Sequence, residues 1–143
     1  GAPYWRPDVR GLITGLTRNS DWKSLVRAVV ESVAYQSYDL FNSMRKDGLK
    51  PSIVKVDGGM VANNWFSQFL SDIINLNVIR PRVLETTALG VALFAGYQVG
   101  EFKSLNEIKL IWKKDRVFSP KLNKSLRNNL LQGWKVAIRK TLA

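Results

Sequence analysis

The chain has 143 residues, of which 45% are apolar and 23% are charged, a composition typical of one globular domain. It contains neither cysteine nor histidine, which excludes disulfides, thiolate nucleophiles, imidazole metal ligands and Ser-His-Asp catalysis. Its 22 basic and 11 acidic side chains give a net charge of +11, a balance that favours a ligand carrying phosphate or other negative charge.

The positive charge is concentrated at the C-terminal end. Residues 1–102 carry 11 basic and 9 acidic side chains, a net of +2, whereas residues 103–143 carry 11 and 2, a net of +9. This tail leaves one alternative open, a basic module that binds nucleic acid or an acidic surface. Basic residues spread along an amphipathic helix more often form a solvated face, so we do not expect nucleic acid as a partner.

The ends of the chain and its longest uncharged stretch bear on location. The N-terminus lacks the apolar segment of a secretory signal, and the first methionine is Met44, so we expect a piece of a longer cytoplasmic protein. Residues 86–100 form the longest uncharged run, with 15 residues, whereas a membrane span needs about 20. We therefore expect a buried helix here and no membrane insertion.

The pattern of apolar residues predicts the elements in chain order. Residues 1–19, rich in proline and glycine, predict a loop, and apolar residues at helical spacing after Ser20 or Asp21 predict a long helix that ends before Gly48. The β-branched residues that follow predict a short buried strand ending at Asp57. The next predicted elements are a helix capped by Asn63 or Asn64, a strand over 77–81 and a helix from Glu85 onward.

The order of elements over residues 53–99 is β-α-β-α. It predicts parallel strands joined by right-handed crossovers, with ligands at the carboxyl ends of the strands. Ser104 and Glu107 form a capping box that opens a short helix, a brief strand is expected over 115–118, and an amphipathic helix follows over 122–138. The predicted fold class is α/β, with short parallel strands and long helices.

The segment Asp57-Gly-Gly-Met-Val-Ala-Asn-Asn64 lies between a predicted strand and a predicted helix. Its glycines let backbone N–H groups approach an anion, and the following helix start adds further donors, so the turn could hold a phosphate. Asp57 could orient a water molecule bound to magnesium. The structural alternative is a tight turn that needs glycine for a positive φ angle, followed by an ordinary asparagine N-cap. Spacing alone leaves both interpretations open.

Longer strings carry a more specific signal. In order and spacing, four of them resemble the C-terminal domain of the FGGY carbohydrate kinase family, in particular its glycerol-phosphorylating members: GAPYWRPDVRGLITGLTR, ESVAYQSYDL, VDGGMVANNWFSQFLSDI and RPRVLETTALGVALFAGYQVG. The later strings FSP and QGWKVAIRK extend the resemblance over essentially the whole chain. The resemblance implies an actin-like, ribonuclease H-like ATPase fold and transfer of the γ-phosphoryl group of ATP to a substrate hydroxyl, with Mg²⁺ on the nucleotide.

The resemblance also assigns residues to this function. Residues 1–143 would be a C-terminal fragment of the nucleotide-binding domain, in which the Gly59 backbone meets a phosphate of ATP or ADP and Asn63 contacts the adenine side. The residues that would shape the turn around them are Asp57, Gly58, Met60 and Ala62. The family often has alanine where this chain has Met60. No catalytic residue and no metal ligand is expected in this chain.

The catalytic aspartate and the glycerol-binding residues of the family lie upstream of the first matching string. The expected partner is therefore an N-terminal kinase domain, and for this chain alone we expect at most weak nucleotide affinity and no turnover. Another polyol or sugar stays an alternative substrate. Without the upstream strands, open sheet edges and an uncovered apolar face would favour self-association.

Overall fold

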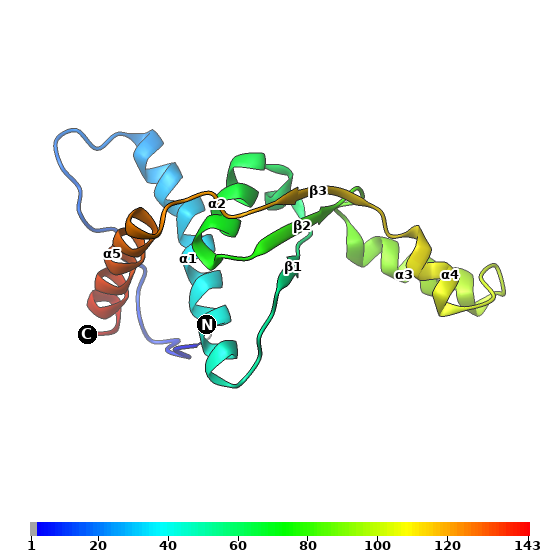
Figure 1. Cartoon of the computed structure of the whole chain (residues 1–143). Helices are drawn as coiled ribbons and strands as arrows, with labels where there is room; N and C mark the ends of the chain where they lie inside the picture. The colour runs from blue at the N-terminus through cyan, green and yellow to red at the C-terminus, as the bar shows by residue number, and fades with distance from the viewer. Residues whose placement is uncertain (1–2) are drawn as a thin grey trace.

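The computed structural model describes residues 3–143, so residues 1 and 2 of the predicted loop lie outside the described residues. A small sheet forms the centre, three helices gather at one end of it, and two helices extend from the other end (Figure 1). The elements are α1 (Trp22–Lys46), β1 (Ile53–Lys55), the 3-10 helix η1 (Gly59–Ala62), α2 (Asn64–Ile74), β2 (Asn77–Pro81), α3 (Thr86–Gln98), α4 (Leu105–Ile111), β3 (Lys114–Phe118) and α5 (Lys124–Leu142).

The long helix α1 follows the predicted loop and has the predicted bounds. The side chain of Asp21 caps it by accepting a hydrogen bond from the N–H of Ser24 at 2.8 Å, which satisfies one of the free donors of the first turn. Hydrogen bonds from the Ser24 hydroxyl and N–H hold the pKa of Asp21 below its usual value. Gly48, with a φ angle of +91°, follows the last turn, where a left-handed residue commonly ends a helix.

The three strands pair in the order β1-β2-β3. Strands β1 and β2 are parallel, as predicted, with Ile53 opposite Asn77. Strand β3 is antiparallel to β2, with Val78 opposite Phe118, so the sheet is mixed and the prediction of parallel strands holds only for the first pair. The antiparallel pairing arises because the chain leaves β2, passes through α3 and α4 and returns along β2 without crossing the sheet.

Helix α2 contributes more residues to the apolar core than any other element. It packs against α1 and against the sheet, and it also contacts α5 (Figure 1). The ring of Tyr35 from α1 stacks on Trp134 of α5 with centroids 5.5 Å apart and meets Phe69 of α2 edge-on at 5.6 Å. The buried apolar residues are Ala34, Tyr35, Val61, Phe66, Phe69, Leu70, Ile73, Ile74, Val78, Phe118 and Leu131.

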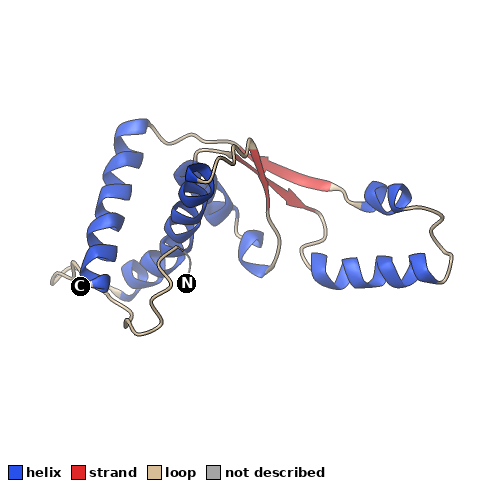
Figure 2. Ribbon diagram, turned by 90° about the horizontal axis from the view of Figure 1, so that it is seen from below, coloured by secondary structure: helices blue, strands red, loops and turns tan. Residues whose placement is uncertain are grey.

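Two predictions of burial are wrong for the described residues. No residue of α3 is buried, and Val91 and Phe94 are 67% and 62% exposed. Figure 2 shows the reason, because α3 and α4 extend away from the end of the sheet where α1, α2 and α5 pack. Strand β1 ends at Lys55 rather than Asp57, and Ile53 is 48% exposed because its side chain lies outside the apolar core.

A helix that spans a bilayer needs about 20 mainly apolar residues. Among residues 3–143, no helix is both long enough and apolar enough to cross a membrane.

Candidate functional site

The segment between β1 and α2 begins with a bend at Gly58. This residue has φ +86° and ψ 171°, a backbone conformation that is open to glycine and almost closed to other residues. Its N–H donates to the carbonyl of Leu84 at 2.9 Å, and Leu84 follows β2. The segments that leave the carboxyl ends of the two parallel strands therefore meet, as the sequence predicts for a ligand site.

The site residues expected from the sequence lie together on one exposed segment. The residues of this segment that are exposed are Asp57, Gly59, Met60, Ala62 and Asn63. The 3-10 helix η1 is formed by Gly59–Ala62. A Cβ atom placed on Gly59 meets no heavy atom of residues 3–143 within 4 Å, so open space lies directly beside its backbone. The structure thus leaves room beside Gly59 for a group that approaches the backbone closely.

Asn63, rather than Asn64, is the N-cap of α2. Its side-chain oxygen accepts hydrogen bonds from the N–H groups of Trp65 at 2.9 Å and Phe66 at 3.2 Å. Its own N–H donates to the carbonyl of Met60 at 3.2 Å, which closes η1 against the start of α2. The structural role expected of an asparagine at this position is therefore present, and the Oδ1 atom is committed to it.

A shallow groove lies beside Asn63. It has a volume of about 370 Å³ and is lined by Trp22, Lys23, Val26, Arg27, Val30, Asn63 and Trp65. The Arg27 guanidinium lies 5.5 Å from the ring centroid of Trp65 and is paired with Glu31 at 2.7 Å. The groove therefore combines apolar walls with the basic side chain of Lys23 and with an Arg27 whose charge is paired with Glu31.

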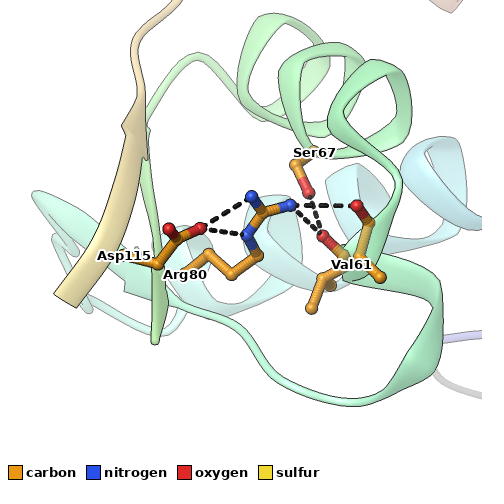
Figure 3. A network of polar contacts seen from close by, with 5 residues as sticks. Val61, Ser67, Arg80 and Asp115 are labelled. Atoms are coloured by element: carbon orange, nitrogen blue, oxygen red, sulfur yellow. Dashed lines mark hydrogen bonds and ion pairs between the residues drawn. The ribbon is translucent and has the colours of Figure 1, made fainter. Parts of the chain in front are cut away.

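The inner side of the turn is fixed by a buried arginine on β2 (Figure 3). Nη1 of Arg80 donates to the carbonyl of Val61 at 2.8 Å and to that of Ala62 at 3.1 Å. Nε and Nη2 of the same side chain bind Asp115 at 2.8 and 2.7 Å. The Ser67 hydroxyl also donates to the Val61 carbonyl, at 3.0 Å, so η1 is held from both α2 and β2.

Sequence reasoning missed Arg80, although one signal was available. Val78 and Arg80 are two residues apart in the predicted strand over 77–81 and so point to the same face, which the apolar side chain of Val78 marks as the one facing the core. A charged residue on a buried face needs a partner, so this pattern predicts an acidic side chain near Arg80. Within residues 3–143, no three acidic side chains gather closely enough to hold a metal ion.

Comparison with known proteins places this geometry in a family. Residues 1–99 match the FGGY family of carbohydrate kinases, C-terminal domain. The chain belongs to the FGGY family. Its curated relatives include the glycerol kinase of Gluconobacter oxydans strain 621H, which is 52% identical over 143 residues, and glycerol kinase 1 of Pseudomonas aeruginosa, which is 49% identical over 140 residues.

The match covers nearly all of this chain and a minor part of each relative. It includes 99% and 98% of the chain for these two proteins but 28% of the length of each of them. A crystal structure of Plasmodium falciparum glycerol kinase with ADP superposes with a TM-score of 0.83 at 36% identity, over 99% of this chain and 29% of that one.

A more distant structure shows the same FGGY fold. Ligand-bound xylulose kinase from Lactobacillus acidophilus superposes with a TM-score of 0.71 at 25% identity, over 92% of this chain and 26% of that one. These neighbours confirm the predicted fold class, an α/β part of the actin-like ATPase fold.

Proposed function

We propose that residues 1–143 are the C-terminal, nucleotide-binding portion of an ATP-dependent glycerol kinase. The observation that carries the proposal is the 52% and 49% identity to proteins named glycerol kinase across nearly the entire chain. Identity to a xylulose kinase of the same family is 25%, which favours glycerol over another polyol or a sugar. The comparisons give no support to the alternative of a basic module that binds nucleic acid or an acidic surface.

The nucleotide site of this proposal is the exposed turn between β1 and α2. The Gly59 backbone receives a phosphate, because a side chain is absent there and the space beside it is open. Asn63 and the adjacent groove receive the adenine end, and Asp57, Gly58, Met60 and Ala62 shape the turn. The crystal structure of Plasmodium falciparum glycerol kinase is one with ADP, which supports this choice of ligand.

Magnesium enters the proposal through the nucleotide. Asp57 is the single formal charge among residues 57–64, and residues 3–143 assemble no cluster of three acidic side chains. A Mg²⁺ ion with so few carboxylates is normally bound mainly through phosphate oxygens and water. When bound, it would neutralise phosphate charge, while this chain supplies the backbone surface and at most one carboxylate.

The remaining steps of the reaction belong to residues outside this chain. Phosphoryl transfer requires both substrates in line and a residue that orients the attacking hydroxyl. The chain spans 28% of the length of the curated relatives named above, and we propose that an N-terminal kinase domain supplies the catalytic aspartate and the glycerol site. Residues 1–143 alone then bind ADP weakly and do not turn over.

A chimaera tests the proposed function. The matching C-terminal 28% of the Gluconobacter oxydans protein is replaced by residues 1–143, and ADP release is measured with ATP and glycerol. We expect release that depends on glycerol, and none from residues 1–143 alone. A chimaera that folds but shows no glycerol-dependent release would contradict the proposal that residues 1–143 are the nucleotide-binding portion of a glycerol kinase. Turnover by residues 1–143 alone would contradict the division of roles.

We further propose a cytoplasmic location, where ATP is supplied, and self-association of the isolated chain. Strand β1 is an edge strand with Ile53 exposed, and α3 exposes Val91 and Phe94. Exposed edges and apolar residues of this kind favour pairing with another chain. Light scattering should show a mass above that of one chain, and a monodisperse monomer would contradict the proposal.

A further inference from the structure

We propose that Arg80 is a positioning residue for the nucleotide turn. It sets the backbone of η1 in the arrangement that a phosphate meets beside Gly59, and Asp115 in turn orients Arg80. This inference rests on the proposed function, because it assigns Arg80 a task at the proposed nucleotide site. Arg80 binds the carbonyl side of the turn, and no atom of it lies within 4 Å of a Cβ placed on Gly59.

The hydrogen bonds of Arg80 fix two consecutive peptide groups. Its Nη1 atom binds the carbonyls of Val61 and Ala62 at 2.8 and 3.1 Å. A peptide group is planar, so holding its carbonyl oxygen also fixes the direction of its N–H. The two bonds therefore limit rotation at the end of η1, directly before Asn63. A turn that is already ordered loses less conformational entropy when it binds a ligand.

Asp115 determines which atoms of Arg80 remain for the turn. It binds Nε and Nη2, so Nη1 is left to point at η1 (Figure 3). The Arg80 side chain is 10% exposed and that of Asp115 is 41% exposed, so the guanidinium has little access to water. Because the guanidinium is planar and rigid, fixing one edge of it fixes the direction of the remaining donors.

An irregularity in β3 brings Asp115 to this face of the sheet. Arg80 lies opposite Arg116 and Pro81 lies opposite Lys114, which leaves Asp115 as an extra residue between the two pairs. Residues 115 and 116 of a regular strand would point to opposite faces. A bulge of this kind redirects a side chain, and here it lets Asp115 reach the guanidinium from the neighbouring strand.

Loss of Arg80 should leave the surrounding fold in place. The Val61 carbonyl also accepts a hydrogen bond from Ser67, so η1 stays attached to α2. Asp115 is partly exposed, so water can replace its lost partner. The expected defect is therefore local: a less ordered turn on an intact core.

The chain offers a matched control arginine at the other end of α2. Nε of Arg127 donates to the carbonyl of Ile73 at 2.9 Å. Replacing Arg127 with methionine removes a hydrogen bond from an arginine to a backbone carbonyl of α2, as Arg80→Met does for η1. Both variants remove hydrogen bonds from an arginine to backbone carbonyls, but Arg80→Met acts at the proposed nucleotide turn and also removes the ion pair to Asp115.

The experiment compares wild type, Arg80→Met, Arg80→Lys, Asp115→Asn and Arg127→Met by NMR. Amide hydrogen exchange is measured for residues 59–63 and for residues 69–74, and ADP affinity is taken from shift changes during titration. We expect Arg80→Met to exchange at least about tenfold faster at residues 61–63 only, and to bind ADP about tenfold more weakly. Arg80→Lys keeps the positive charge but lacks the planar guanidinium with its several N–H donors, so it should lose most of the ADP affinity. Asp115→Asn should lose less of it.

The control decides between positioning and plain stabilisation. Arg127→Met should leave ADP affinity and exchange at residues 61–63 unchanged. Equal losses of affinity in Arg80→Met and Arg127→Met, or unchanged affinity in Arg80→Met, would overturn the inference. Failure of the proposed function looks different, because wild type would then show no ADP-dependent shifts at residues 57–63. In that case the exchange data, which need no ligand, would show that Arg80 only stabilises the structure of η1. The inference would then be overturned.

Discussion

Replacing each of the two glycines of the turn with alanine should have a different effect, on stability for Gly58 and on ADP affinity for Gly59. Gly58 has φ +86° and ψ 171°, a region used almost only by glycine, in which a residue with a side chain costs of the order of 1–3 kcal/mol. Space is not the difficulty, since a Cβ on Gly58 meets no heavy atom of residues 3–143 within 4 Å. Gly58→Ala should therefore lower the free energy of unfolding by about 1–3 kcal/mol through backbone strain alone.

Gly59 should show the opposite result. It is not among the glycines with a positive φ angle, and a Cβ placed on it also enters open space. Gly59→Ala should change the free energy of unfolding by no more than about 0.5 kcal/mol. The new methyl group would occupy the space beside the backbone where the proposal places a phosphate. ADP affinity should then fall at least about tenfold, equivalent to about 1.4 kcal/mol.

Urea unfolding followed by tryptophan fluorescence measures the stability of both variants, and titration with ADP measures their affinity. A large loss of stability for Gly59→Ala would refute the backbone geometry described for Gly59. Unchanged ADP affinity in a stable Gly59→Ala variant would refute the placement of the phosphate. A Gly58→Ala variant as stable as wild type would show that the bend does not require glycine.

Three further predictions concern the N-cap of α2, the apolar core and the stability of the protein at low pH. Asn63→Ala should cost about 0.5–2 kcal/mol of stability by removing the cap of α2, and it should also weaken ADP binding. Asn63→Asp should keep the cap and lose only the binding. Urea unfolding and ADP titration separate the two effects. Ile73→Ala, at a fully buried site, should cost about 2–5 kcal/mol in urea unfolding, and a loss below about 1 kcal/mol would place Ile73 outside the core. The lowered pKa of Asp21 means that its ionised form stabilises α1 above the unfolded pKa of about 3.9 and that this contribution disappears as pH falls through the lower folded value. Tm measured against pH should therefore fall less steeply below about pH 4 in Asp21→Asn, which retains a side-chain acceptor, and identical slopes would contradict this assignment.

Local signals in the sequence were sufficient for much of the fold. Helical spacing and caps predicted α1 and α2, because side chains such as Asp21 and Asn63 bind N–H groups two or three residues away. The parallel pairing of β1 and β2 followed from the helix between them. The position of the segment from Asp57 to Asn63 between a strand and a helix followed for the same reason, since it depends on neighbouring elements.

Features that depend on distant residues were not predictable in this way. The uncharged segment of α3 indicated burial, but Val91 and Phe94 are exposed because no described element packs over them. The direction of β3 depends on how the chain returns from α4. The bond between Arg80 and Asp115 joins residues 35 positions apart through a bulge that apolar spacing does not reveal.

The central claim is that the turn between β1 and α2 is a nucleotide site, and an NMR titration of the ¹⁵N-labelled protein with ADP tests it most directly. We expect the largest shift changes on residues 57–63, with smaller changes at the groove residues Trp22 and Trp65. Shift changes confined to the basic helix α5, or none at residues 57–63 at saturating ADP, would contradict it.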